Sequence, residues 1–234
     1  MPVTILFLTV LAAIAGWWLL TQKLDAKPWL EEGVIGEFDG TGAMSVPAGK
    51  IGMGLFLAVV GSLFALLVSA YFMRMGFPDW RNIRVPGLLW VNTGALIAAS
   101  IALQAAQSAV YRHNLEGVRA RLLVACAFGV MFLAGQLLAW QELTASGFLL
   151  ASNPSNSFFY LITGLHGLHV IGGTAGLAWT TERARRAEST EPLRTGVEMC
   201  TMYWHFLLFV WVVLFSLLTG WADEFGELCR QLLS

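Results

Sequence analysis

Long apolar segments dominate the chain. Six stretches are predominantly apolar and long enough to cross a lipid bilayer, which takes about 20 residues of α-helix. We place them at residues 2–20, 51–73, 87–110, 122–140, 158–179 and 197–221. The sequence therefore predicts an all-α fold, a polytopic membrane helix bundle of about six transmembrane helices.

The first apolar segment stands apart from the other five. A polar stretch over residues 21–50 follows it and contains several charged residues and glycines. We expect an N-terminal transmembrane helix with its polar loop over residues 1–48, and a five-helix membrane domain over residues 49–234. A cleaved signal peptide is the alternative for residues 2–20. Because this segment lacks a positively charged start and a clear small-residue cleavage site, we interpret it as a true span.

Charges in the loops orient the predicted bundle. Cytoplasmic loops of membrane proteins carry an excess of Lys and Arg. One set of alternate connections carries ten such residues, and the other set, which includes both termini, carries four. This bias predicts a multi-pass protein of the bacterial inner membrane with both termini on the periplasmic side.

Composition supports a membrane location and excludes some other classes. The chain is 57% hydrophobic and only 12% charged, whereas soluble domains carry about 25% charged residues. The net charge of −1 gives no basic field that would attract nucleic acid. The three cysteines, Cys126, Cys200 and Cys229, share no spacing typical of a metal site.

Two local signals concern helix starts and helix packing. Asn153 followed by Pro154 is typical of a helix N-terminus, so the fifth span should begin there. Gly172 and Gly176 are four residues apart, which is the spacing that lets membrane helices approach closely. We interpret these two glycines as a packing feature of the fifth helix.

A few ionisable residues fall inside the last two predicted spans. His166 and His169 are three residues apart and share one helix face, and Glu198 and His205 lie seven apart in the next helix. Such groups are costly at bilayer depth. A metal or haem site, a proton path and a hydrogen-bonded structural network are all compatible with them. We favour the structural network and expect no catalytic, cofactor or metal ligand in this chain. Its members would be His166, His169, Glu198, Tyr203, Trp204 and His205.

Several motifs resemble those of subunit III of haem-copper oxidases. Residues 163–169 read T-G-L-H-G-L-H, similar to the T-G-x-H-G-x-H signature of that family. In the last span, Glu198 precedes the run Tyr203-Trp204-His205-Phe206, with Trp211 beyond it. Earlier blocks also resemble the family: residues 50–53 with Phe56, residues 90–93 with Ser100, and Phe132, Gln136 and Trp140.

The resemblance implies a non-catalytic subunit of a proton-pumping terminal oxidase that reduces oxygen to water, with cytochrome c as the expected electron donor. Such a subunit supports proton uptake and the stability of the catalytic subunit. It implies no redox cofactor in this chain, haems and copper in partner subunits, and bound phospholipid. Its partners would be the catalytic subunit I, other oxidase subunits and membrane lipids, with no nucleic acid. Three intramembrane histidines are too few for the haem and copper ligands of a catalytic subunit.

Two positions depart from the family pattern. Many members carry a Glu in the second span where this chain has Val60, and many carry an Asp where it has Leu208. Functions linked to those carboxylates therefore do not transfer. Other possibilities stay open: a haem b membrane anchor using His166 or His169 with His205, subunit III of a quinol oxidase, or a small transporter.

Overall fold

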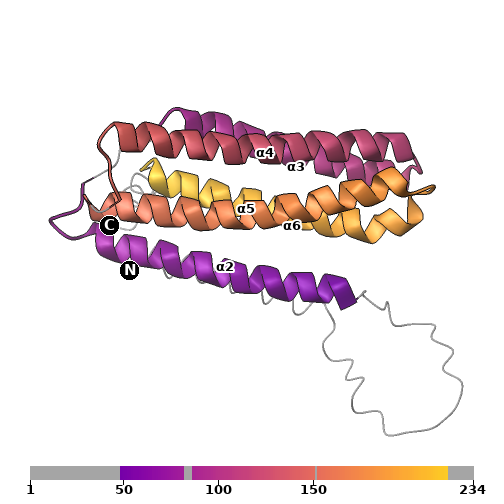
Figure 1. Cartoon of the computed structure of the whole chain (residues 1–234). Helices are drawn as coiled ribbons and strands as arrows, with labels where there is room; N and C mark the ends of the chain where they lie inside the picture. The colour runs from indigo at the N-terminus through magenta and orange to yellow at the C-terminus, as the bar shows by residue number, and fades with distance from the viewer. Residues whose placement is uncertain (1–47, 82–85, 151, 221–234) are drawn as a thin grey trace, which may run out of the picture. The chain divides into compact units, whose positions relative to one another are not determined.

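The computed structural model describes residues 48–81, 86–150 and 152–220, and these residues form helices joined by short loops. The helices are α2 (Ala48–Met75), α3 (Leu88–Tyr111), α4 (Leu115–Ala145), α5 (Pro154–Arg186) and α6 (Arg194–Leu218). A short 3₁₀ helix, η2 (Glu191–Leu193), precedes α6. Figure 1 shows the five long helices running along a common direction.

All five of these helices are long and apolar enough to cross a membrane. They match the second to sixth predicted spans in order, which confirms the predicted all-α membrane bundle. The predicted first span and its polar loop, residues 1–47, lie outside the described residues. By internal contacts the chain divides after Pro47, and the five helices belong to the unit that begins at Ala48.

Three of the helices, α2, α4 and α5, extend at both ends beyond the apolar stretches that predicted them. α4 begins seven residues before the predicted span, with Asn114 as its N-cap, and the Asn114 side chain accepts a hydrogen bond from the Gly117 amide at 2.8 Å. α5 begins at the predicted Asn153-Pro154 signal, and the Asn153 side chain accepts from the Ser155 amide. Hydropathy marks where the apolar bilayer core ends, whereas a backbone hydrogen-bond ladder continues through charged turns outside it.

A charged side chain completes one of these helix ends. The last carbonyls of an α-helix have no partner within the helix. Arg119 of α4 donates to the Ala184 carbonyl at 2.8 Å and to the Ala187 carbonyl at 2.9 Å. The cation also lies favourably at the negative end of the α5 dipole. Arg119 therefore fixes the end of α5 against the start of α4.

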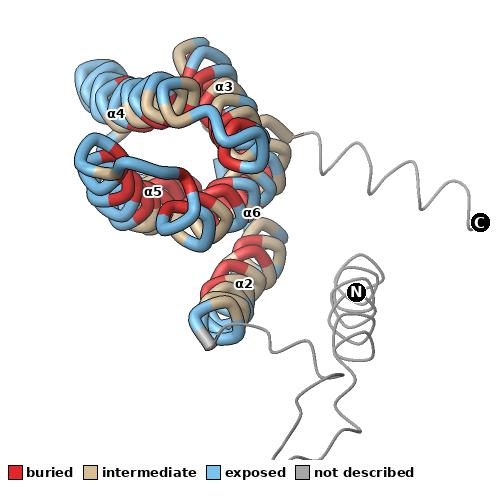
Figure 2. Tube along the Cα trace, turned by 90° about the vertical axis from the view of Figure 1, so that its right-hand side faces the viewer, coloured by how far each residue is buried: buried red, intermediate tan, exposed pale blue. Residues whose placement is uncertain are grey.

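Four helices, α3 to α6, enclose the main core. Each packs against two others in the cycle α3–α4–α5–α6–α3, while α2 lies against α5 and α6. Figure 2 shows the four helices end-on with their buried residues turned inward, and α2 beside α6. The largest fully buried side chains are Trp204, Trp211, Phe132 and Phe159. A second apolar cluster joins α2 to the bundle through Val60, Phe64, Val68, Tyr71, Ile162, Val210, Leu214 and Leu217.

Two glycines allow aromatic rings to reach the helix backbones. A methyl group at Gly173 would lie 2.6 Å from Cε1 of Tyr203, and one at Gly129 would lie 2.7 Å from Cη2 of Trp204. At Gly172 and Gly176, no described atom lies within 4 Å of such a methyl group. The described residues therefore contain no close helix contact at Gly172 and Gly176, and that prediction stays untested for residues 1–47 and for other subunits. The neighbouring Gly173 faces α6 because the helix turns by about 100° per residue.

We expect Gly173→Ala to destabilise the bundle by about 1–3 kcal/mol, the usual cost of overpacking a core. The Tyr203 ring cannot simply rotate away, because its hydroxyl donates to the His169 carbonyl at 2.9 Å. Gly172→Ala is the matched control and should leave stability unchanged or slightly raised, since Ala favours helices. The melting temperatures of the two variants are measured by heating the purified chain with a fluorescent maleimide, which labels its cysteines as they become exposed on unfolding. Equal melting temperatures for the two variants would contradict the packing described here.

Candidate functional site

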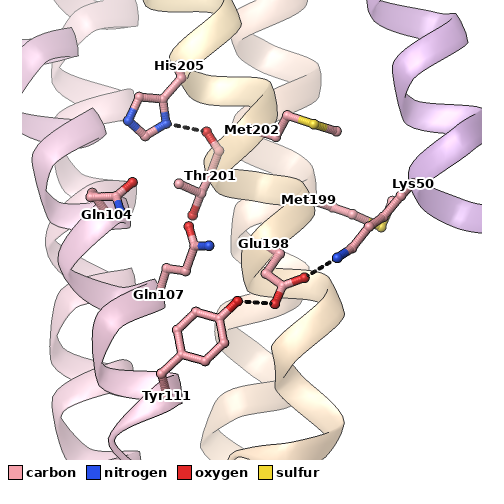
Figure 3. A pocket seen from close by; sticks show the side chains of 9 residues that line it. All are labelled: Lys50, Gln104, Gln107, Tyr111, Glu198, Met199, Thr201, Met202 and His205. Atoms are coloured by element: carbon pink, nitrogen blue, oxygen red, sulfur yellow. Dashed lines mark hydrogen bonds and ion pairs between the residues drawn. The ribbon is translucent and has the colours of Figure 1, made fainter. Parts of the chain in front are cut away.

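Glu198 is the centre of a charged cluster that joins three helices. Its carboxylate lies 2.6 Å from Lys50 Nζ of α2 and accepts hydrogen bonds from Tyr111 Oη of α3 at 2.6 Å and Arg194 Nε of α6 at 3.1 Å. The Arg194 guanidinium also lies 4.8 Å from the centre of the Tyr111 ring. Figure 3 shows the carboxylate between Lys50 and Tyr111. Glu198 thus binds α2 and α3 to α6 at one end of the bundle.

His166 lies in the interior and is surrounded by aromatic rings. The centre of its ring is 5.0 Å from that of Trp211, 5.7 Å from Phe132 and 6.2 Å from Phe64. The residue is fully buried, and neither ring nitrogen has a hydrogen-bond partner among the described residues. His166 therefore contributes to the core through ring packing, at the point where α4, α5 and α6 meet.

The other two intramembrane histidines bond to their own helices. His169 Nδ1 lies 2.8 Å from the Leu165 carbonyl, and His205 Nδ1 lies 2.6 Å from the Thr201 carbonyl. Each is a contact to the residue four positions earlier. Because a carbonyl oxygen only accepts, Nδ1 carries the proton in both rings. The opposite nitrogen, Nε2, is then the acceptor of each neutral ring.

The six residues predicted to form one hydrogen-bonded network do not form a single network of side chains in the structure. Of the six residues placed in that network, Tyr203 and His169 are joined by the bond from the Tyr203 hydroxyl to the His169 backbone. Trp204 is buried against Gly129, and its Nε1 has no partner within the described part of the chain. Glu198 bonds to cations and a tyrosine instead of a histidine. The structure thus distributes the six residues over separate packing and hydrogen-bond contacts.

The partners of Glu198 are only partly evident from the sequence. The four-residue spacing of Arg194 and Glu198 is a readable helical ion-pair signal. Lys50 and Tyr111 stand at the ends of other spans, and nothing in their local sequence links them to Glu198. Their meeting depends on how three helices are rotated and tilted, which hydropathy and periodicity do not determine.

A second set of polar contacts lies deeper, between α3, α4 and α6. Trp211 Nε1 donates to Thr93 Oγ1 at 2.9 Å, and the Thr93 hydroxyl donates to the Leu89 carbonyl. Beside Thr93, the buried Asn92 approaches α4 so closely that a methyl group at Gly135 would lie 2.0 Å from its Oδ1. These residues belong to the blocks that resemble the oxidase family, and their contacts hold helices together.

Metal-binding side chains are not clustered in the described residues. Within residues 48–81, 86–150 and 152–220, no group of three or more His, Cys, Asp or Glu side chains could hold a metal ion. Cys126 and Cys200 are free thiols in these ranges.

The two positions that depart from the family pattern are apolar contacts. Val60 is buried at 4% exposure in the cluster that joins α2 to α5 and α6. Leu208 is half-buried and packs against the main core. α2 contains no Asp or Glu, so no carboxyl group is available on this helix.

Comparison with known proteins connects these features to one family. Residues 4–223 match the family model described as cytochrome c oxidase subunit III. The chain is 31% identical over 175 residues to cytochrome c oxidase subunit 3 of Thermostichus vulcanus, covering 72% of this chain and 85% of that protein. It is 33% identical over 175 residues to cytochrome c oxidase subunit 3 of a Synechocystis species, covering 71% and 72%. A relative of the same name from Corynebacterium diphtheriae is 30% identical over 174 residues, covering 71% of this chain and 84% of its own length.

Proposed function

The chain belongs to the cytochrome c oxidase subunit III family, and from this premise we propose that it is the non-catalytic third subunit of a proton-pumping terminal oxidase. The family match covers residues 4–223, nearly the whole chain. Membership makes the chain part of an oxidase complex that reduces oxygen. Its bacterial relatives and its five described spans make it a multi-pass protein of a bacterial membrane.

The role we propose is to support proton uptake and to stabilise the catalytic subunit, without holding haem or copper. One observation carries this proposal: residues that match the family motifs serve helix-to-helix contacts. Glu198 binds Lys50 and Tyr111 across three helices, and Trp211 binds Thr93. His166 is enclosed by aromatic rings instead of facing an open site. A rigid membrane scaffold of this kind suits an accessory subunit, with phospholipid as its expected non-protein ligand.

Co-purification tests the proposed assembly. An affinity tag on this chain, used with a mild detergent, should recover a haem-copper catalytic subunit together with its haem and copper. Mass spectrometry and a reduced-minus-oxidised spectrum identify them, and oxygen uptake with reduced cytochrome c or with quinol identifies the electron donor. A tagged chain that emerges alone with a bis-histidine haem spectrum would instead support the haem b anchor, with His166 or His169 and His205 as ligands.

We also propose that the chain ends on the periplasmic side. The first turns of α2, α4 and α6 and the last turns of α3 and α5 meet at one end of the bundle, through the Lys50–Glu198 and Arg119–Ala184 contacts. Most of the Lys and Arg residues lie in segments at this end, which the positive-inside bias assigns to the cytoplasm. α6 then ends, at Leu218, on the periplasmic side.

Alkaline phosphatase fusions check this orientation. A fusion after Ser234 should be active, because the enzyme folds only outside the cytoplasm. A fusion in the connection between α5 and α6, at residue 188, should be inactive and serves as the control. The reverse pattern would contradict the proposed orientation.

A further inference from the structure

A groove follows the surface between α3 and α6, and its mostly apolar lining includes several polar side chains. It consists of two adjacent hollows of about 440 and 490 Å³ that share Gln104 and His205. Lys50 and Glu198 line one end, and Ile97 and Leu208 line the other. Figure 3 shows the imidazole of His205 on the side of α6 that faces Gln104 of α3.

The two shared residues lie at bilayer depth and are exposed. Gln104 is seven residues before the end of α3, and His205 is eleven residues after the start of α6. At 1.5 Å per residue these offsets place them about 10 and 16 Å from the helix ends, inside a hydrocarbon core of about 30 Å. Polar side chains at this depth usually face protein or water, because facing lipid is costly.

The middle of the other outward surfaces is mainly apolar. Exposed residues in the middle of α2, α4 and α5 include Val59, Leu63, Val130, Met131, Leu168 and Ile171, all of which suit contact with acyl chains. An acyl chain cannot hydrogen-bond to an amide or an imidazole, and a lipid headgroup lies near the interface instead of the bilayer centre. The groove is therefore suited to a protein partner.

The hydrogen-bond chemistry defines what this partner must present. His205 Nδ1 is bound to the Thr201 carbonyl at 2.6 Å, so the neutral ring offers Nε2 as an acceptor. Gln104 offers an amide donor and an acceptor. The nearby groove residues Ser100, Ala105 and Ser108 are small, which allows a helix backbone to approach closely. The matching partner is a transmembrane helix with a hydrogen-bond donor near mid-membrane.

We infer that the α3–α6 groove is the surface on which a transmembrane helix of the catalytic subunit docks. The identity of this partner rests on the proposed function, in which the catalytic subunit is the principal neighbour. The exposed polar pair Gln104 and His205 supplies the specificity of the contact.

Photo-crosslinking in the intact membrane complex tests the surface. The photoreactive residue p-benzoylphenylalanine replaces Ile101, which lines the groove and is 64% exposed, or Leu168 of α5 as a control with 61% exposure. We expect Ile101 to yield an adduct with a transmembrane helix of the catalytic subunit, and Leu168 to yield far less. An adduct with residues 1–47, with a second copy of this chain, with another subunit or with lipid alone overturns the inference. Co-purification of the catalytic subunit is scored in the same sample, so failure of the surface is distinguished from failure of the proposed function.

A double variant tests the chemistry. Gln104→Leu combined with His205→Leu should raise dissociation from the purified complex roughly fivefold to tenfold, the effect of losing two membrane hydrogen bonds. Leucine suits an exposed membrane position, so the melting temperature of the isolated chain should not fall. Leu168→Ala is the control and should dissociate like the unmodified chain. A double variant that remains bound as firmly as this control overturns the inference.

Discussion

Glu198→Leu should loosen α2 from the bundle and lower the free energy of unfolding by about 2–4 kcal/mol. Hydrogen bonds to charged groups contribute about 1.5–3 kcal/mol each, and removing one partner leaves the others unpaired. Glu198 accepts from Tyr111 and Arg194 and pairs with Lys50, and its side chain is only 11% exposed. Without the Glu198 carboxylate, the cations Lys50 and Arg194 lose the negative charge with which both of them pair.

The position of α2 makes this loss consequential. Among the described long helices, α2 packs mainly against α5 and α6, and few of its residues are buried. Its apolar cluster with Ile162 and Val210 remains after the substitution, but the ionic contact at its first turn is lost. We therefore expect α2 to separate before the four-helix core unfolds. Protease cleavage near Lys50 should accelerate at temperatures at which α3 to α6 remain intact.

A surface ion pair provides the matched control. Glu182 pairs with Arg186 at 2.8 Å within one turn of α5, where both side chains are well exposed. Exposed pairs contribute about 0.2–1 kcal/mol, so Glu182→Leu should change the melting temperature little. Lys50→Met should add little once Glu198 is replaced, because the two side chains form one interaction. Similar losses for Glu182→Leu and Glu198→Leu would contradict the proposed importance of this cluster.

The sequence was sufficient to predict properties that depend on one helix at a time. Apolar length located the second to sixth spans, and Asn153 with Pro154 located the start of α5. Glu198 and His205, which helical spacing places on one face, line the same hollow. The contacts of His169 and His205 to carbonyls four residues earlier are also local. Such a bond could have been anticipated for a membrane histidine, because a backbone acceptor is always within reach.

Properties that depend on two or more helices could not be predicted in this way. Whether Gly172 or Gly173 faces α6 is decided by a rotation of about 100°, and only the packed structure shows Tyr203 against Gly173. Glu198 was expected beside histidines, yet Lys50 and Tyr111 reach it from separate spans. His166 was expected to form hydrogen bonds, and it is instead enclosed by Phe132 and Trp211. In each case helix rotation and tilt determine the contact.

Removing this subunit from the oxidase should shorten the working life of the enzyme without removing its redox centres. The motif residues described here form helix contacts, and none of them belongs to a metal-binding cluster in the described residues. In the proposed function, oxygen chemistry takes place in a partner subunit. The subunit is proposed to support proton supply, so its loss should act over many turnovers. The initial rate of oxygen reduction should remain largely intact, and activity should then decline at least several-fold faster than in the complete complex.

Groove variants provide a graded form of the same experiment. Gln104→Leu with His205→Leu should weaken retention of the subunit, and the rate of inactivation should follow the fraction of complexes that have lost it. Returning purified subunit to the stripped enzyme should restore its endurance. If the rate of inactivation does not depend on the fraction of complexes that retain this subunit, the proposal that the subunit stabilises the catalytic subunit is contradicted.

One paired measurement on complexes with and without this chain tests the accessory role. Haem and copper content is determined in each preparation, and oxygen uptake is then followed continuously through inactivation. An accessory scaffold predicts unchanged haem and copper, a similar initial rate and a faster decline when the chain is absent. Haem or copper that leaves with the chain, or activity that vanishes at once while the partner stays folded, would contradict it.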